Sequence, residues 1–162
     1  MTLLRGYTGV VPTVRIIYAS TSGHTEYVAG IVAETLRMGG LDVSATRAEK
    51  ATAEDLTASD LVILGSGTWN TGGPEGQLNP HMQAFVFGPA KAAELKGKNV
   101  AVIALGDERY RYTARAGEHL KNFVQSHGGK VFGEQLTIVN EPYGQEERVK
   151  KWAGTIVTSL LR

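Results

Sequence analysis

The chain has 162 residues, an ordinary apolar content and a formal net charge of +1 at pH 7. A charge this close to zero gives no support to a nucleic-acid or membrane-surface role, and the lack of cysteine excludes disulfides, thiol catalysis and cysteine-ligated metals. Any redox role must therefore rest on a bound cofactor. Because no signal-peptide core and no apolar run of membrane-spanning length occurs, we expect a cytoplasmic protein of one domain.

Strand and helix patterns alternate along the chain. Apolar and β-branched runs predict strands over residues 13–19, 41–46, 61–64, 100–105 and 130–138. Apolar residues at helical spacing follow each strand, over residues 28–36, 53–57, 80–87, 116–124 and 149–160. This alternation predicts an α/β fold, a doubly wound parallel sheet with helices on both faces. We expect residues 13–162 to form this domain and residues 1–12 to be an N-terminal extension.

Three loops are expected to lie together at one end of this sheet. Ligands of doubly wound sheets bind beyond the carboxyl ends of the strands, where the strand order reverses. The loops after the first, third and fourth predicted strands lie at that end, and they have the most unusual compositions in the chain. Elsewhere we find no Ser-His-Asp arrangement and no metal-ligand spacing. We therefore predict no catalytic residue and no metal site.

The first of these loops reads Ser20-Thr21-Ser22-Gly23-His24-Thr25 and leads from a strand directly into a helix. Its hydroxyl groups, with the unpaired N–H groups and partial positive charge of a helix N-terminus, predict a phosphate site. Because the loop has no lysine or arginine, we expect the monoester of a retained cofactor rather than a triphosphate turned over with Mg²⁺. An ordinary capped turn is the alternative, since serine and threonine are good N-caps. The His24 ring would either touch the phosphate or face solvent.

Aromatic residues mark the second and third loops. Trp69 lies in a glycine-rich stretch over residues 65–73, where a flat ligand or its own loop would cover the indole. Asn70 takes the place of the third glycine of a dinucleotide fingerprint, so we reject that reading. In the third loop Tyr110 and Tyr112 alternate, which indicates either an exposed loop or a wall of a slot for a planar ring. The other tryptophan, Trp152, lies on the apolar stripe of the last helix and is expected in the core.

Together these loops resemble the FMN-binding loops of the flavodoxin family. The motifs that carry the resemblance are Ser20-x-Ser22-Gly23-x-Thr25, Thr68-Trp69-Asn70 and Gly106-Asp107-x-x-Tyr110-x-Tyr112. Their order and spacing match, and the similarity extends over roughly residues 13–160. It implies the short-chain branch of the family, a flavodoxin-like three-layer sandwich with a five-stranded parallel sheet of order 2-1-3-4-5, and FMN as the cofactor.

The resemblance also implies a role for each matched residue. The first loop would hold the FMN phosphate, Trp69 would stack on the inner face of the isoalloxazine, and Tyr110 on the outer face. The backbone carbonyl of Asn70 would turn toward flavin N5 on one-electron reduction. The residues expected along the pyrimidine edge are Leu105, Gly106, Asp107 and Tyr112. The full set of expected cofactor-binding residues is Ser20, Thr21, Ser22, Gly23, His24, Thr25, Gly67, Thr68, Trp69, Asn70, Thr71, Leu105, Gly106, Asp107, Tyr110 and Tyr112.

The function that the resemblance implies is that of a low-potential one-electron carrier with non-covalently bound FMN, not an enzyme. It would be a monomer that shuttles electrons from a flavin- or iron–sulfur-containing reductase to an acceptor enzyme. Two alternatives remain, an NAD(P)H:quinone reductase on the same fold and a flavin-free binding module.

One departure from the family concerns charge. Flavodoxins are typically strongly acidic, whereas Arg109, Arg111 and Arg115 outnumber Asp107 and Glu108 in this chain's third loop. We expect net positive charge beside the flavin, and a partner whose docking face is not strongly basic.

Overall fold

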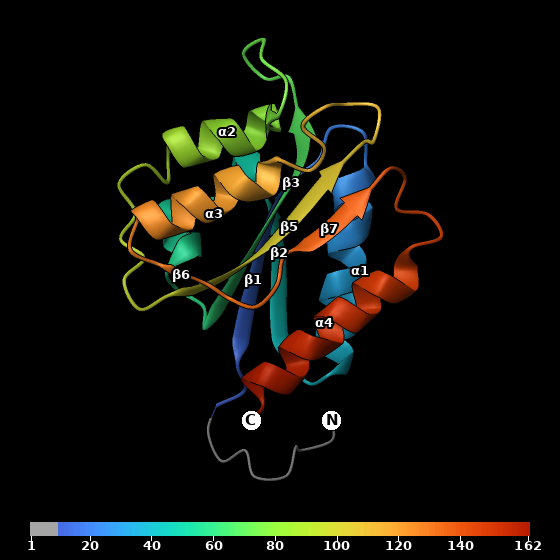
Figure 1. Cartoon of the computed structure of the whole chain (residues 1–162). Helices are drawn as coiled ribbons and strands as arrows, with labels where there is room; N and C mark the ends of the chain where they lie inside the picture. Colours follow the sequence, from blue (N-terminus) through green and yellow to red (C-terminus); the bar gives the residue numbers. More distant parts are fainter. Residues whose placement is uncertain (1–9) are drawn as a thin grey trace.

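A parallel sheet of apolar strands forms the middle layer of the computed structural model, which describes residues 10–162 (Figure 1). Its strands are β1 (Thr13–Ala19), β2 (Asp42–Arg47), β3 (Leu61–Trp69), β4 (Gln77–Leu78), β5 (Asn99–Gly106), β6 (Lys130–Val131) and β7 (Leu136–Val139). They run in the order β2-β1-β3-β5-β6, β7 also pairs with β5, and all of these pairings are parallel. The predicted order of the doubly wound sheet is therefore confirmed.

Two pairs of helices cover the two faces of the sheet (Figure 1). The helices are α1 (His24–Met38), α2 (Pro80–Phe87), α3 (Ala116–Ser126) and α4 (Glu146–Leu160), with short 3₁₀ turns at Ala48–Lys50 and Ala53–Leu56. Side chains alternate along β1, so Ile16 belongs to the core under α1 and α4, and Ile17 to the core under α2 and α3. No helix within residues 10–162 is long and apolar enough to cross a membrane.

Strand β3 is longer than predicted, which changes the position of the tryptophan. The sequence indicates a strand over residues 61–64, but pairing with β5 continues as far as Gly67, opposite Leu105. Beyond it, Thr68 and Trp69 pair antiparallel with β4. Gly65 pairs with both β1 and β5 and Gly67 with β5, so the tertiary pairing outweighs the weak strand preference of glycine. Trp69 therefore stands at the end of a strand and not inside a flexible loop.

The predicted fifth strand over residues 130–138 is divided in two. Strands β6 and β7 both pair with β5, and the chain leaves the sheet between them. Gly133 has a φ of 66°, a left-handed conformation that strand geometry does not accommodate. The predicted extension over residues 1–12 lies largely outside the described residues. Its last residue, Pro12, accepts a hydrogen bond from the Asp42 N–H (N···O 3.1 Å) and so adjoins the start of β2.

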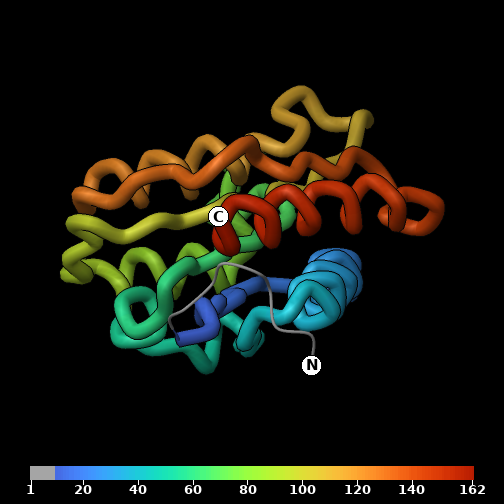
Figure 2. Tube along the Cα trace, turned by 90° about the horizontal axis from the view of Figure 1, so that it is seen from below, coloured from blue at the N-terminus to red at the C-terminus, as the bar shows by residue number. Residues whose placement is uncertain are grey.

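The loops that follow β1, β3 and β5 gather at one end of the sheet, at the top of Figure 1. Figure 2 views the molecule from the opposite end and shows the red trace of α4 next to the blue trace of α1. The two helices approach closely at Gly39, which follows α1. A Cβ atom at this position would lie 2.6 Å from Cγ2 of Val157 in α4.

We predict that Gly39→Ala lowers the free energy of unfolding by about 1–3 kcal/mol, the usual cost of overpacking, because the stiff Val157 side chain must move. The matched control is Gly30→Ala within α1, where no atom lies within 4 Å of the new Cβ. That variant should raise stability by roughly 0.5–1 kcal/mol through helix propensity. Urea unfolding of both variants measures the difference, and equal effects would show that α1 and α4 are not closely packed at Gly39.

Candidate functional site

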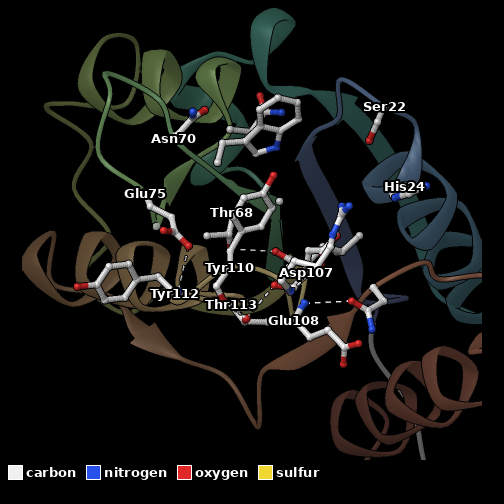
Figure 3. Close-up of a pocket in the computed structure, with 18 of the residues that line it drawn as sticks. Ser22, His24, Thr68, Asn70, Glu75, Asp107, Glu108, Tyr110, Tyr112 and Thr113 are labelled. Atoms are coloured by element: carbon white, nitrogen blue, oxygen red, sulfur yellow. Dashed lines mark hydrogen bonds and ion pairs between the residues drawn. The ribbon is translucent and has the colours of Figure 1, made fainter.

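A cavity of about 630 Å³ lies between the loops that follow β1, β3 and β5 (Figure 3). This volume is within the range of sites that hold cofactors and other small molecules. Thirteen of the predicted site residues line the cavity, namely Thr21, Ser22, His24, Thr25, Gly67, Thr68, Trp69, Asn70, Leu105, Gly106, Asp107, Tyr110 and Tyr112. The remaining three, Ser20, Gly23 and Thr71, are not among its lining residues.

The start of α1 presents backbone donors at one side of the cavity. Gly23 is the N-cap residue and has a φ of 95°, which glycine adopts without strain. Ser20 satisfies one donor of the first turn, because its Oγ accepts a hydrogen bond from the Glu26 N–H (3.2 Å). Within residues 10–162, no acceptor is present for the N–H groups of residues 22–25. These donors and the helix dipole make this end of the cavity suitable for an anion.

An arginine outside the first loop stabilises the conformation of that loop through two polar contacts. Arg47, at the end of β2, donates from Nη1 to the Ser20 carbonyl (3.1 Å) and pairs through Nη2 with the Glu26 carboxylate. The Tyr18 hydroxyl donates to the same carboxylate (3.2 Å). Burial and the neighbouring Glu26 charge both raise the pKa of Tyr18, so its hydroxyl keeps its proton at neutral pH. The polar contacts of Ser20 are thus directed to the protein, which fits a loop-building role.

Trp69, the last residue of β3, lines the cavity, and the two residues before it, Gly67 and Thr68, set its position. A Cβ atom at Gly67 would lie 3.0 Å from the indole Nε1, so the absence of a side chain there lets the ring fold back over the strand. Thr68 joins three elements, because its Oγ1 donates to the Leu105 carbonyl (2.9 Å) and accepts from the Ala116 N–H (3.1 Å). The Thr68 hydroxyl therefore makes its hydrogen bonds to other parts of the protein. The indole itself is half-buried and lines the cavity.

The peptide after the tryptophan begins a tight turn. The Asn70 carbonyl accepts a hydrogen bond from the Gly73 N–H (2.9 Å), and Gly72 has the positive φ of 80° that a type II turn requires at this position. Thr71 Oγ1 donates to the Leu78 carbonyl (2.6 Å) and ties the turn to β4. Any reorientation of the Asn70 carbonyl must therefore break a hydrogen bond within the turn.

The third loop is built around an ion pair. Asp107 accepts hydrogen bonds from the backbone N–H of Arg109 and from its guanidinium Nε, both at 2.9 Å. The Arg109 hydrogen bonds lower the pKa of Asp107, so the carboxylate stays ionised at neutral pH. Thr113 closes the loop, because its hydroxyl lies within hydrogen-bond distance of the carbonyls of Tyr110 (2.7 Å) and Asp107 (2.9 Å), which share its one hydrogen. The result is a defined turn that holds the Tyr110 ring, which is 53% exposed, toward the cavity (Figure 3).

Charge around the cavity differs from the sequence-based expectation. Arg111 and Arg115 do not line the cavity but flank the ring of Tyr112, at 5.6 and 4.6 Å from its centroid. In Figure 3 this ring points away from Tyr110, beyond Glu75. The charged side chains that line the cavity are Glu75, Asp107, Glu108, Arg109 and Glu141. The expectation of net positive charge beside the ligand is therefore wrong, because the loop turns two of its arginines outward and pairs the third with an aspartate.

The His24 ring belongs to an aromatic cluster at the edge of the cavity. It meets the Tyr143 ring edge-on, with centroids 5.6 Å apart, and Tyr143 in turn contacts Tyr27 at 5.0 Å. The Tyr27 hydroxyl donates to Glu146 Oε2 (2.6 Å), which raises the pKa of Tyr27 and lowers that of Glu146. These contacts connect the first loop with the segment before α4.

Sequence reasoning missed eight of the lining residues, which are Glu75, Gly76, Asn79, Glu108, Arg109, Thr113, Asn140 and Glu141. Asn79 was detectable as a helix N-cap, since it precedes Pro80 at the first position of α2, but nothing in the sequence placed it near the first loop. Asn140 has a φ of 67° and accepts a hydrogen bond from the Glu108 N–H (3.0 Å). No local pattern predicts a contact across 32 residues.

A doubly wound α/β sandwich with N–H groups at a helix start that are unpaired within residues 10–162, and with two aromatic residues lining the same cavity, is typical of proteins that bind a flavin nucleotide. A sequence model of the flavodoxin family matches residues 16–152. A flavodoxin of Maridesulfovibrio salexigens is 30% identical over 146 residues, covering 90% of this chain and 97% of that protein. Probable flavodoxin 1 of Bacillus subtilis is 32% identical over 132 residues, covering 82% of this chain and 80% of that protein. The solved structure of oxidised flavodoxin 2 from Bacillus cereus superposes with a TM-score of 0.81 at 30% identity, covering 91% and 97% of the two chains.

The chain therefore belongs to the flavodoxin family, in its short-chain branch. Members of this family bind FMN and carry electrons between redox partner proteins, and this chain is an FMN-binding electron carrier rather than an enzyme. The quinone reductase alternative is not favoured, since the family model and the relatives at about 30% identity are flavodoxins. A flavin-free module is excluded by the same membership.

We predict that Arg109→Gln raises the pKa of Asp107 toward the ordinary range of an aspartate, because the guanidinium hydrogen bonds, the largest cause of the lowered pKa, are lost while the backbone N–H bond is kept. In the unaltered protein the contribution of the ion pair is present at neutral pH and is lost as the pH falls through the lowered pKa. Carboxyl ¹³C NMR during an acid titration measures the midpoint. Arg111→Gln is the matched control, since Arg111 contacts Tyr112 and not Asp107. A shift of the Asp107 midpoint in the control alone would contradict the assignment.

Proposed function

We propose that FMN binds in the cavity with its phosphate at the start of α1 and its ring system between Trp69 and Tyr110. The observation that carries this proposal is the set of N–H groups over residues 22–25 without acceptors in the described part of the chain. The dianionic phosphate of FMN supplies the acceptors that these donors lack. The hydroxyls of Ser22 and Thr25, which line the same side, add donors without adding charge.

The opposite part of the cavity suits a planar ring. Trp69 is half-buried at the end of β3, and Tyr110 stands on a turn closed by the Asp107–Arg109 pair. An exposed tyrosine beside an open slot gains buried area and stacking energy when a flat ligand enters. Leu105 and Gly106 at the end of β5 line the same space, where the polar edge of the ring would lie.

When bound, FMN supplies the one-electron redox chemistry that the cysteine-free chain does not have. The residues of the chain bind and orient it. The start of α1 fixes the phosphate, Trp69 excludes water from one ring face, and the carbonyl of Asn70 remains close to the slot. Carboxylates of Glu75, Glu108 and Glu141 border the cavity, and their negative charge opposes the build-up of further negative charge on the ring. We infer a low-potential carrier.

Redox partners would approach the rim of the slot. We propose a flavin- or iron–sulfur-containing reductase as donor and an enzyme as acceptor, with the carrier acting as a cytoplasmic monomer. Exposed Tyr110 and Tyr112 belong to the cavity lining, exposed Tyr143 contacts the lining residue His24, and all three offer apolar contact area. The central test is a redox titration of the purified yellow protein with mass spectrometry of the released cofactor. Recovery of FAD, or of no flavin, would overturn the proposed site.

We predict that Ser22→Ala combined with Thr25→Ala weakens FMN far more than riboflavin. Two hydroxyl donors to a charged phosphate are lost, at about 1.5–3 kcal/mol for each bond that is made, whereas riboflavin has no phosphate. Titration of the apoprotein with each flavin, followed by quenching of flavin fluorescence, gives both dissociation constants. An equal loss for the two ligands would show that the phosphate lies elsewhere.

We predict that Trp69→Ala and Tyr110→Ala each weaken oxidised FMN by about 1–3 kcal/mol, the range for stacking of aromatic side chains on nucleobases. Trp152→Phe is the control. Trp152 is only half-buried, packs against the core under α1 and α4, and donates from Nε1 to the Glu134 carbonyl (2.7 Å). Its replacement should lower the free energy of unfolding by about 1 kcal/mol, for the lost hydrogen bond, and leave FMN affinity unchanged. A stronger effect of Trp152 than of Trp69 on flavin fluorescence would reverse the two assignments.

A further inference from the structure

A buried asparagine connects the first loop with the start of α2. Asn79 is 1% exposed and precedes Pro80 as the N-cap residue of the helix. Its Oδ1 accepts a hydrogen bond from the His81 N–H (2.9 Å), which fixes the orientation of the amide. Its Nδ2 then donates to Oγ1 of Thr21 (3.0 Å), 58 residues earlier in the chain. Both residues line the cavity.

This contact determines what the Thr21 hydroxyl can do. A hydroxyl has one hydrogen to donate, and an oxygen that accepts from an amide must direct that hydrogen elsewhere. Among the described residues no acceptor for the Thr21 hydroxyl hydrogen is present. An oxygen that already accepts a hydrogen bond is also a stronger donor, because chains of hydrogen bonds polarise one another. Thr21 is thus prepared to donate to an anion in the cavity.

A second buried side chain holds Asn79 in place. Ser66 is fully buried in β3, and its Oγ accepts the Asn79 backbone N–H (3.0 Å) while donating to the Gly67 carbonyl (2.8 Å). The Asn79 carbonyl accepts from the Gln83 N–H within α2. Every one of these partners is at hydrogen-bond distance, so the side chain has little freedom to leave Thr21. The amide also has a second Nδ2 hydrogen that the Thr21 bond does not use.

We propose that Asn79 is a positioning residue for the FMN phosphate, acting by fixing the Thr21 hydroxyl as a donor. The proposal rests on the proposed function, in which the phosphate occupies the start of α1. It assigns to α2 a part in phosphate recognition that the first loop by itself does not contain. Asn79 therefore favours the phosphorylated flavin over riboflavin.

The test measures dissociation constants of the apoprotein for FMN and for riboflavin, with ³¹P NMR of bound FMN as a second readout. Asn79→Ser keeps a good N-cap for α2 but is too short to reach Thr21. We expect FMN affinity to fall about ten- to a hundredfold, the equivalent of one hydrogen bond to a charged group, with riboflavin affinity little changed. The ³¹P resonance should move, because the donor set around the phosphate differs.

A double-mutant cycle with Thr21→Ala separates this role from general support of the fold. If Asn79 acts through Thr21, Asn79→Ser should have little further effect on the ratio of FMN to riboflavin affinity once the hydroxyl is gone. Asn79→Asp should also lower this ratio, because the carboxylate turns the Thr21 hydrogen toward itself and repels the phosphate. The matched control is Asn122→Asp, which adds the same charge at an exposed position of α3 that does not line the cavity, and it should leave the ratio close to that of the unaltered protein.

Each outcome decides between the two proposals. Equal losses for FMN and riboflavin in Asn79→Ser would overturn the positioning role and leave the phosphate site standing. Additive effects of Asn79→Ser and Thr21→Ala on the ratio would likewise overturn the coupling. If the unaltered apoprotein binds riboflavin as tightly as FMN, the phosphate site itself is wrong, and the role of Asn79 is wrong with it. Urea unfolding of each variant shows whether α2 remains folded.

Discussion

Burial of the parallel sheet on both faces is the constraint on which the rest of this structure depends. Strands β1, β3 and β5 have almost no exposed side chains along their central residues, so their backbone groups pair within the ladder and their side chains fill two cores. Apart from Arg15 in β1, which contacts Thr46 and Asp55, the charged residues around these three strands stand beyond the strand ends. Because the strands are parallel, their carboxyl ends meet at one edge, and the loops after them form one cavity.

The polar groups around that cavity divide into those that build the loops and those left for a ligand. Ser20 and Thr68 use their hydroxyls on protein partners, although each belongs to a motif shared with the flavodoxin family. The N–H groups over residues 22–25 have no such partners in the described chain. One motif thus contains residues that build the loop and residues whose donors remain for a ligand, and composition alone does not distinguish the two. Distance and direction decide which of them can bind a cofactor.

Electrostatics at the site also depends on local geometry more than on residue counts. The third loop has more arginines than acids, yet Arg109 is paired with Asp107, and Arg111 and Arg115 pack on Tyr112 outside the cavity. The carboxylates of Glu75 and Glu141 come to the rim from other segments. The cavity therefore borders more acid than base in a chain of net charge +1. Cavity charge is a property of the folded surface and cannot be summed from one stretch of sequence.

The sequence alone determined the fold class, because alternating apolar periodicity is a local signal that can be read along the chain. The order and spacing of three loop motifs indicated the family, and the family in turn implied the strand order. Through the resemblance of its loop motifs to those of flavodoxins, it also indicated thirteen residues that line the cavity. Only the tertiary structure decided that β3 continues to Trp69, that Asn79 reaches Thr21, and that Asn140 supports Glu108. Those contacts join residues far apart in the chain, and their partners are fixed by packing of whole elements, for which neither propensity nor spacing carries information.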